Sequence, residues 1–120
     1  MNLMPDLHLA DRASMGIGCV FERHVSIGAD AKLGSFVTVL SNAIIGYDVT
    51  VGSYSTVSSF VFIGGGAQIG EDVVIHPHAT ILPKVKIGDG ATIGAGSVVI
   101  GNVPAGITVF GNPAKRFRFK

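Results

Sequence analysis

Large apolar residues recur at every sixth position along most of the 120-residue chain. The run starts at Leu9 and ends at Val99 without an insertion, and a smaller residue follows each member four places later. Glycine often stands directly after the large residue, as in "IIGYDVTVG" at 44–52. The sixteen large positions are Leu9, Met15, Phe21, Ile27, Leu33, Val39, Ile45, Val51, Val57, Ile63, Ile69, Ile75, Ile81, Ile87, Ile93 and Val99.

This spacing excludes a helix and fits short strands. Six residues do not return to one helix face at 3.6 residues per turn, whereas two positions four apart share one face of a strand. β-branched residues dominate the run, and glycine or polar residues mark the bends. Three units close a triangular coil of about eighteen residues, and such coils stack as parallel β-structure. The pattern therefore predicts an all-β, parallel β-helix of about five triangular coils.

Composition and charge limit the classes of binding partner and the cellular compartment that we expect for the protein. The net charge of +1 argues against nucleic-acid and membrane-surface partners, which would need a strong basic excess. The single cysteine, Cys19, excludes an internal disulfide and fits a reducing compartment. The opening "MNLMPDLHLAD" lacks the basic region of a secretory signal, and no stretch approaches about 18 uninterrupted apolar residues. We expect a single-domain cytoplasmic protein.

Three stretches resemble the hexapeptide-repeat acyltransferases: the repeat itself, "IGDGATIGAGSVVIGNVPAG" at 87–106, and "VFGNPAKRF" at 109–117. Within that superfamily the chain looks most like the repeat domain of bacterial sialic-acid and nucleotide-sugar acetyltransferases. The resemblance implies a left-handed winding and a homotrimer. It also implies acetyl-CoA or another acyl-CoA as acyl donor, and a small-molecule acceptor such as a sugar. The expected organisation is an N-terminal cap (1–8), the β-helix (9–103), and a C-terminal cap with a basic tail (104–120).

The tyrosine in "IIGYDVTVG" departs from the family pattern. Those acetyltransferases carry a catalytic histidine in a stretch like Ile-x-His-Asp/Glu-x-x-x-Gly, and here Tyr47 occupies the histidine position with Asp48 after it. The resemblance thus implies Tyr47 and Asp48 as the catalytic positions. Free tyrosine titrates near about 10 and histidine near about 6.5, so a phenol is a poor base at neutral pH. We hypothesise that Tyr47 orients substrate in an unusual acyltransferase. The alternative is a catalytically degenerate trimeric module that binds a ligand or acts as a scaffold.

One corner of the predicted prism carries few side chains. Steps of eighteen from Tyr47 and Asp48 reach Gly65, Gly66, Pro83, Lys84, Gly101 and Asn102. Glycine lets a ligand approach the backbone closely, so a groove is expected along this corner. In the family, the pantetheine arm of coenzyme A lies in such a groove between subunits, with its thioester near the histidine, so Lys84, Lys115 and Arg116 are candidate partners for the phosphates of the coenzyme. The candidate coenzyme-binding residues are Gly65, Gly66, Pro83, Lys84, Gly101, Lys115 and Arg116.

A second corner carries histidines. Steps of eighteen place His24, Asn42 and His78, together with Phe60, on one outward edge. In a trimer this edge could face the Tyr47 corner of a neighbour, so Asn42, His78 and His24 are candidates for the substrate part of a composite site. The alternative is a plain surface or interface role. A zinc site like that of the hexapeptide carbonic anhydrases needs three converging imidazoles, which this pattern does not provide, and no metal is expected.

Overall fold

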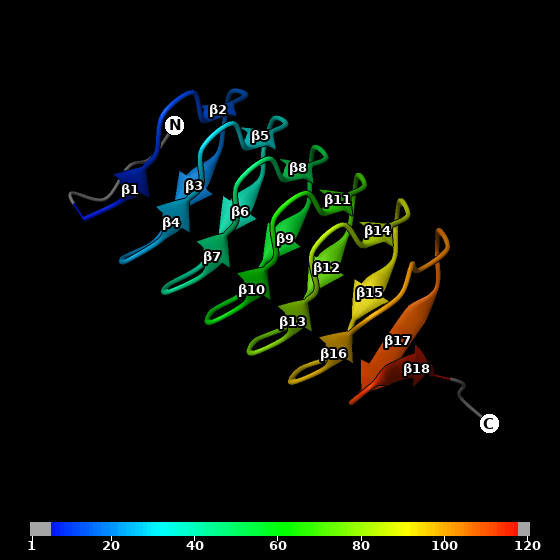
Figure 1. The fold of residues 1–120 in the computed structure, drawn as a ribbon. Helices are drawn as coiled ribbons and strands as arrows, with labels where there is room; N and C mark the ends of the chain where they lie inside the picture. Colours follow the sequence, from blue (N-terminus) through cyan, green and yellow to red (C-terminus); the bar gives the residue numbers. More distant parts are fainter. Residues whose placement is uncertain (1–5, 118–120) are drawn as a thin grey trace.

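The computed structural model describes residues 6–117, and within this range every regular element is a short β-strand (Figure 1). None of these residues forms a helix that could cross a membrane. The strands are β1 (His8–Leu9), β2 (Ser14–Met15), β3 (Val20–Phe21), β4 (Ser26–Ile27), β5 (Lys32–Leu33), β6 (Thr38–Val39), β7 (Ile44–Ile45), β8 (Thr50–Val51), β9 (Thr56–Val57), β10 (Phe62–Ile63), β11 (Gln68–Ile69), β12 (Val74–Ile75), β13 (Thr80–Ile81), β14 (Lys86–Ile87), β15 (Thr92–Ile93), β16 (Val98–Val99), β17 (Thr108–Gly111) and β18 (Ala114–Arg116).

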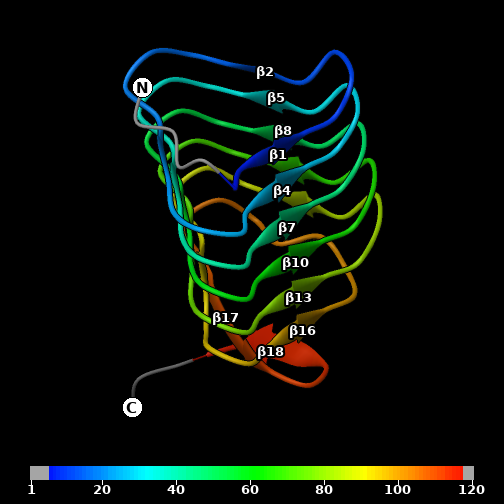
Figure 2. The same ribbon diagram turned by 90° about the vertical axis from the view of Figure 1, so that its left-hand side faces the viewer.

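The strands form the three walls of a column measuring 44 × 22 × 19 Å (Figures 1 and 2). The first wall has the order β1-β4-β7-β10-β13-β16, the second β14-β11-β8-β5-β2, and the third β18-β17-β15-β12-β9-β6-β3. All neighbours are parallel except β17 and β18. The predicted parallel β-helix is confirmed. It has about six turns, because β17 extends the third wall beyond the last regular repeat unit.

The large residues of the repeat fill the interior. Ile45, Ile63 and Ile81 pair in register on neighbouring strands of the first wall, and each is at most 1% exposed. This is the eighteen-residue step that the pattern predicts. The smaller residues pack between the walls, and Cys19 among them is fully buried with its thiol donating to the carbonyl of Gly34 at 3.2 Å. Burial of such apolar surface is the main stabilising contribution.

A residue with a left-handed backbone turns the chain at each corner. Such residues recur at every sixth position from Arg12 to Gly96, each just before one of the smaller inward residues. Three of them are the aromatic residues Phe36, Tyr54 and Phe60, although this conformation costs a non-glycine residue about 1–2 kcal/mol. The ring of Phe36 stacks on that of Tyr54 at 5.5 Å, and that of Phe60 stacks on His78 at 5.0 Å. These contacts offset part of the backbone cost.

The six-residue step ends after Val99. Val103 pairs with Ile87 and Thr108 with Thr92, so the last turn is two residues shorter than the turns before it. The prediction that Asn102 continues the stacking of Lys84 is therefore wrong: its Oδ1 accepts a hydrogen bond from the backbone N–H of Lys86 at 2.9 Å. Proline at 104 and the polar "GN" at 101–102 are compatible with this tighter turn.

The structure describes part of each segment that was predicted to cap an end of the column. At the N-terminal end, β1 starts at His8, and residues 1–5 of the predicted cap lie outside the described residues. At the C-terminal end, β17 turns back as β18 and forms an antiparallel hairpin along the third wall. Residues 118–120 lie outside the described range. The capping role of both segments stays a prediction.

Candidate functional site

Tyr47 lies at the edge between the first and second walls, in the corner that joins β7 to β8. We call the corners between these two walls, at 10–12, 28–30, 46–48, 64–66 and 82–84, the Tyr47 edge. The tyrosine ring lies across Gly65 of the next coil: a Cβ on Gly65 would fall 2.7 Å from ring atoms Cδ1 and Cζ. Tyr47 as a whole is 65% exposed, so much of its surface is open to a ligand. The carbonyl of Tyr47 accepts the N–H of Gly66 at 2.9 Å, which fixes the spacing of the two coils.

Lys84 approaches the same place from the opposite direction. Its backbone N–H donates to the carbonyl of Gly65 at 3.1 Å, and its Cγ would lie 3.4 Å from a Cβ on Gly66. The lysine stem therefore bends back over Gly66 while the Tyr47 ring covers Gly65. Pro83 packs on Gly64, whose missing Cβ would otherwise meet the proline nitrogen at 2.6 Å. The structure thus brings Tyr47, Gly65, Gly66, Pro83 and Lys84 together as predicted, although the edge is less bare than expected.

The charges along this edge are arranged unevenly. Near its N-terminal end, Nε and Nη2 of Arg12 donate to the two carboxylate oxygens of Asp30, at 2.7 and 3.0 Å. Arg12, Asp30, Asp48, Gly66 and Lys84 occupy equivalent left-handed positions on successive coils. Within residues 6–117, neither Asp48 nor Lys84 has an ion-pair partner within 4.0 Å.

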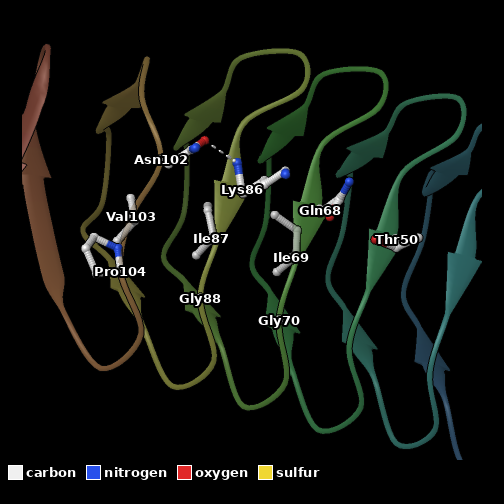
Figure 3. Close-up of a pocket in the computed structure, with 10 residues that line it drawn as sticks. All are labelled: Thr50, Gln68, Ile69, Gly70, Lys86, Ile87, Gly88, Asn102, Val103 and Pro104. Carbon is white, nitrogen blue, oxygen red and sulfur yellow. Dashed lines mark hydrogen bonds between the residues drawn. The ribbon is translucent and has the colours of Figure 1, made fainter.

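A groove of about 420 Å³ lies on the second wall, just beyond the Tyr47 edge (Figure 3). Thr50, Gln68 and Lys86 project from β8, β11 and β14 along it, and Asn102 bounds its C-terminal side. The repeat pattern does not predict this groove, because part of its lining, at Asn102, Val103 and Pro104, belongs to the shortened turn after Val99. The only sequence signal for it was the break in the six-residue step.

The remaining predicted coenzyme residues lie at the C-terminal end of the column. Gly101 and Arg116 line a second cavity, of about 440 Å³, together with Asn102 and residues of β16 and β17. Lys115 lies on β18 opposite Phe110 of β17 and is exposed. Gly101 thus faces this terminal cavity rather than continuing the stack of the Tyr47 edge.

The histidine corner forms as predicted at the edge between the third and first walls. His24, Asn42, Phe60 and His78 all have left-handed backbones there, and the rings of Phe60 and His78 are nearly parallel, at 1°. His24 is also engaged by Asp6, whose Oδ2 lies 3.3 Å from its Nδ1. In the described range no three His, Cys, Asp or Glu side chains gather as a metal site would require. Within one chain this corner and the Tyr47 edge lie on different edges of the column (Figure 2).

The chain is similar in sequence and fold to bacterial transferases built from hexapeptide repeats. Residues 66–101 match the family described as bacterial transferase hexapeptide (six repeats). The acetyltransferase domain of PglB from Neisseria gonorrhoeae FA1090 is 31% identical over 94% of this chain and 55% of that one, with a TM-score of 0.93. The same domain in complex with acetyl coenzyme A gives a TM-score of 0.92. No curated protein matches the chain.

A further solved structure is a histidine-to-alanine variant of GDP-perosamine N-acetyltransferase from Caulobacter crescentus in complex with CoA and GDP-perosamine. It is 26% identical over 96% of this chain and 55% of that one, with a TM-score of 0.83. The chain therefore spans about half the length of these solved proteins.

Proposed function

Because this chain belongs to the hexapeptide-repeat transferase superfamily, we propose that it transfers an acyl group, in the first instance acetyl, from coenzyme A to a hydroxyl or amino group of a sugar or nucleotide sugar. The observation that carries the proposal is the match over 94% of the chain to an acetyltransferase domain solved with acetyl coenzyme A. The Tyr47 edge supports it, since this edge holds the position where the family resemblance expects the catalytic group.

The donor is proposed to lie along the Tyr47 edge. The glycines of this edge are covered only by the exposed Tyr47 ring, the Lys84 stem and Pro83, and the narrow pantetheine arm is proposed to run beside these side chains. The groove on the second wall continues from this edge toward the C-terminal end. Lys115 and Arg116 are exposed there and supply positive charge for the phosphates of the coenzyme through charge-assisted hydrogen bonds.

The proposed reaction joins the acceptor to the acyl carbon. The acceptor oxygen or nitrogen attacks the thioester carbon, the carbon–sulfur bond breaks, and coenzyme A leaves as the thiol after taking up the proton that the acceptor loses. Tyr47 provides a hydroxyl donor and a ring face at the histidine position, and we assign it to orienting the acceptor, with Asp48 beside it. His78 of a neighbouring copy is the proposed imidazole of a composite site. Exposed Ile44 and Phe62, paired on the first wall, are available for packing in the predicted homotrimer.

A second candidate function is favoured by one observation: the histidine of the family stretch is replaced by Tyr47. In that case the column binds a ligand, or holds a partner, without turnover. The two candidates share the fold and differ in chemistry, so binding and catalysis have to be measured separately.

The deciding experiment combines calorimetric titration with acetyl-CoA and a thiol-release assay against a panel of amino and hydroxy nucleotide sugars. The proposal expects both binding and turnover. Binding without turnover supports the second candidate, and no binding at millimolar acetyl-CoA refutes the proposal. Tyr47→His is expected to raise turnover if this position limits proton transfer. Tyr54→His is the matched control, because Tyr54 is a similarly exposed corner tyrosine on another edge, 60% exposed.

A further inference from the structure

Two side chains from different coils converge over one glycine step. Tyr47 comes from the corner between β7 and β8 and its ring covers Gly65, whereas Lys84 comes from the corner between β13 and β14 and its stem lies over Gly66. Gly65 and Gly66 lie in the coil between them and contribute no side chains. The exposed lysine thus stands two coils from the residue that occupies the histidine position, with only glycine between them at these corners.

The positive charge of Lys84 has no carboxylate partner on the neighbouring coil of this edge. Arg12 and Asp30 are one coil apart on this edge and form a two-fold hydrogen-bonded ion pair. Asp48 and Lys84 occupy equivalent corner positions two coils apart, with Gly66 between them, and no ion pair joins them. Coils are separated by about 4.8 Å. A cation two coils from its nearest carboxylate on the edge is free to bind an external anion.

We propose that Lys84 is a specificity-determining residue of the acceptor site, and that it binds an anionic group of the acceptor while the sugar ring lies against Tyr47. The proposal rests on the acyltransferase function proposed above. It assigns the anion to the acceptor because the reacting end of the donor, the thioester and the pantetheine arm, carries no charge. The anion is a phosphate or a carboxylate, since a lysine ammonium binds either as a point charge.

The test compares acceptors that differ only in charge. For each variant, kcat/KM is measured at saturating acetyl-CoA with an amino sugar 1-phosphate, the corresponding uronic acid, and the neutral methyl glycoside. Lys84→Gln is expected to lower kcat/KM about tenfold for whichever anionic acceptor is used naturally, because one charge-assisted contact is lost, and by less than about twofold for the neutral glycoside. The two anionic acceptors distinguish phosphate from carboxylate.

Two further variants isolate the charge. Lys84→Arg should recover most of the lost kcat/KM, because it restores a cation at the same place. Lys32→Gln is the matched control: Lys32 is also exposed and lies on β5 of the second wall, outside the residues that line the groove. It should leave the ratio between charged and neutral acceptors unchanged.

Three results would overturn the assignment. If Lys84→Gln lowered kcat/KM equally for charged and neutral acceptors, the lysine charge would act on the reacting carbonyl and not on an anionic group of the acceptor. If Lys84→Gln raised the KM for acetyl-CoA, the lysine would bind the phosphates of the donor instead. Equal affinity of Lys84→Gln and the unaltered protein for the sugar phosphate and the uronic acid, measured by calorimetry, would remove the anion site altogether. Calorimetry needs no turnover, so it tests Lys84 even if the acyltransferase function itself fails.

Discussion

Three consecutive glycines, Gly64, Gly65 and Gly66, give a test of the corner geometry on which the candidate site depends. Each carries no side chain for a different reason. A Cβ on Gly64 would meet the backbone of Pro83, one on Gly65 would meet the Tyr47 ring, and Gly66 has a left-handed backbone with a φ of 76°. Replacing each in turn by alanine should therefore give three different results.

Gly64→Ala should be the most destabilising. The new Cβ would lie 2.6 Å from the nitrogen and 2.9 Å from the Cα of Pro83, so the coils have to separate by about 0.8 Å to restore ordinary contact at 3.4 Å. The backbone N–H of Gly64 also donates to the carbonyl of Ile81 on the next coil at 2.8 Å, and that hydrogen bond would lengthen. Overpacking of this kind costs about 1–3 kcal/mol. We expect about 3 kcal/mol, because backbone atoms cannot rotate away.

The other two replacements should be milder. In Gly66→Ala the left-handed backbone costs about 1–2 kcal/mol, and the smaller entropy of the unfolded chain returns about 0.4–1 kcal/mol, so the net loss is about 1 kcal/mol. In Gly65→Ala the new methyl displaces the exposed Tyr47 ring, which can swing outward, and the loss in stability should be under about 1 kcal/mol. Only Gly65→Ala should then weaken acceptor binding strongly relative to its effect on stability.

Urea denaturation followed by far-ultraviolet circular dichroism, at one fixed protein concentration, measures the three free energies of unfolding. Gly101→Ala is the control, since a Cβ there would have no heavy atom within 4 Å and its backbone is not left-handed. It should change stability by less than about 0.5 kcal/mol. The reasoning would be refuted by a neutral Gly64→Ala, or by a Gly65→Ala that destabilises as much as Gly64→Ala.

Further predictions concern the core, a buried hydroxyl and an ion pair. Ile63→Ala, at a fully buried position of the first wall, should cost about 2–5 kcal/mol in urea denaturation. Ser55→Ala should cost about 1–3 kcal/mol by the same assay, because the Ser55 hydroxyl accepts the buried N–H of Val73 at 3.1 Å and alanine leaves it unpaired. The hydrogen bond from Arg12 lowers the pKa of Asp30, so its stabilisation exists above the ordinary value of about 3.9 and is lost as the pH falls below it. The midpoint temperature of thermal unfolding should therefore be lower for Asp30→Asn than for the unaltered protein at pH 7, and the two midpoints should converge near about pH 2.

The walls of the column could be predicted from the sequence because a single rule governs them. A two-residue strand that places one large residue inward gives the same six-step pattern wherever it occurs, as at Ile45, Ile63 and Ile81. The corners were less predictable. Their left-handed backbone favours glycine or asparagine, yet Phe36 and Phe60 occupy it. Stacking on the next coil compensates there, and it depends on what lies eighteen residues away rather than on local preference.

The end of the repeat shows where a periodic rule loses its force. Val99 and Val103 continue the spacing in the sequence, four residues apart, and both are buried. The chain nevertheless omits two residues from the corner between them, so that Val103 pairs with Ile87 and the groove opens beside Lys86. An apolar residue fits either register at this point, and the observed register is accompanied by the hydrogen bond from the Lys86 N–H to Asn102. The hydrophobic pattern alone marks where the six-residue step ends, but it does not say which register follows.

The candidate site combines both kinds of information. Steps of eighteen were enough to place Tyr47, Gly65, Gly66 and Lys84 on one edge, because backbone stacking sets that order. The direction of each side chain along the edge is a different matter, since a corner residue can lean toward either neighbouring coil. Glycine in the middle coil is what allows Tyr47 and Lys84 to lean toward each other. The Tyr47 ring and the Lys84 stem therefore both lie over the glycine coil next to the histidine position, and the selectivity expected of Lys84 depends on the two together rather than on either residue alone.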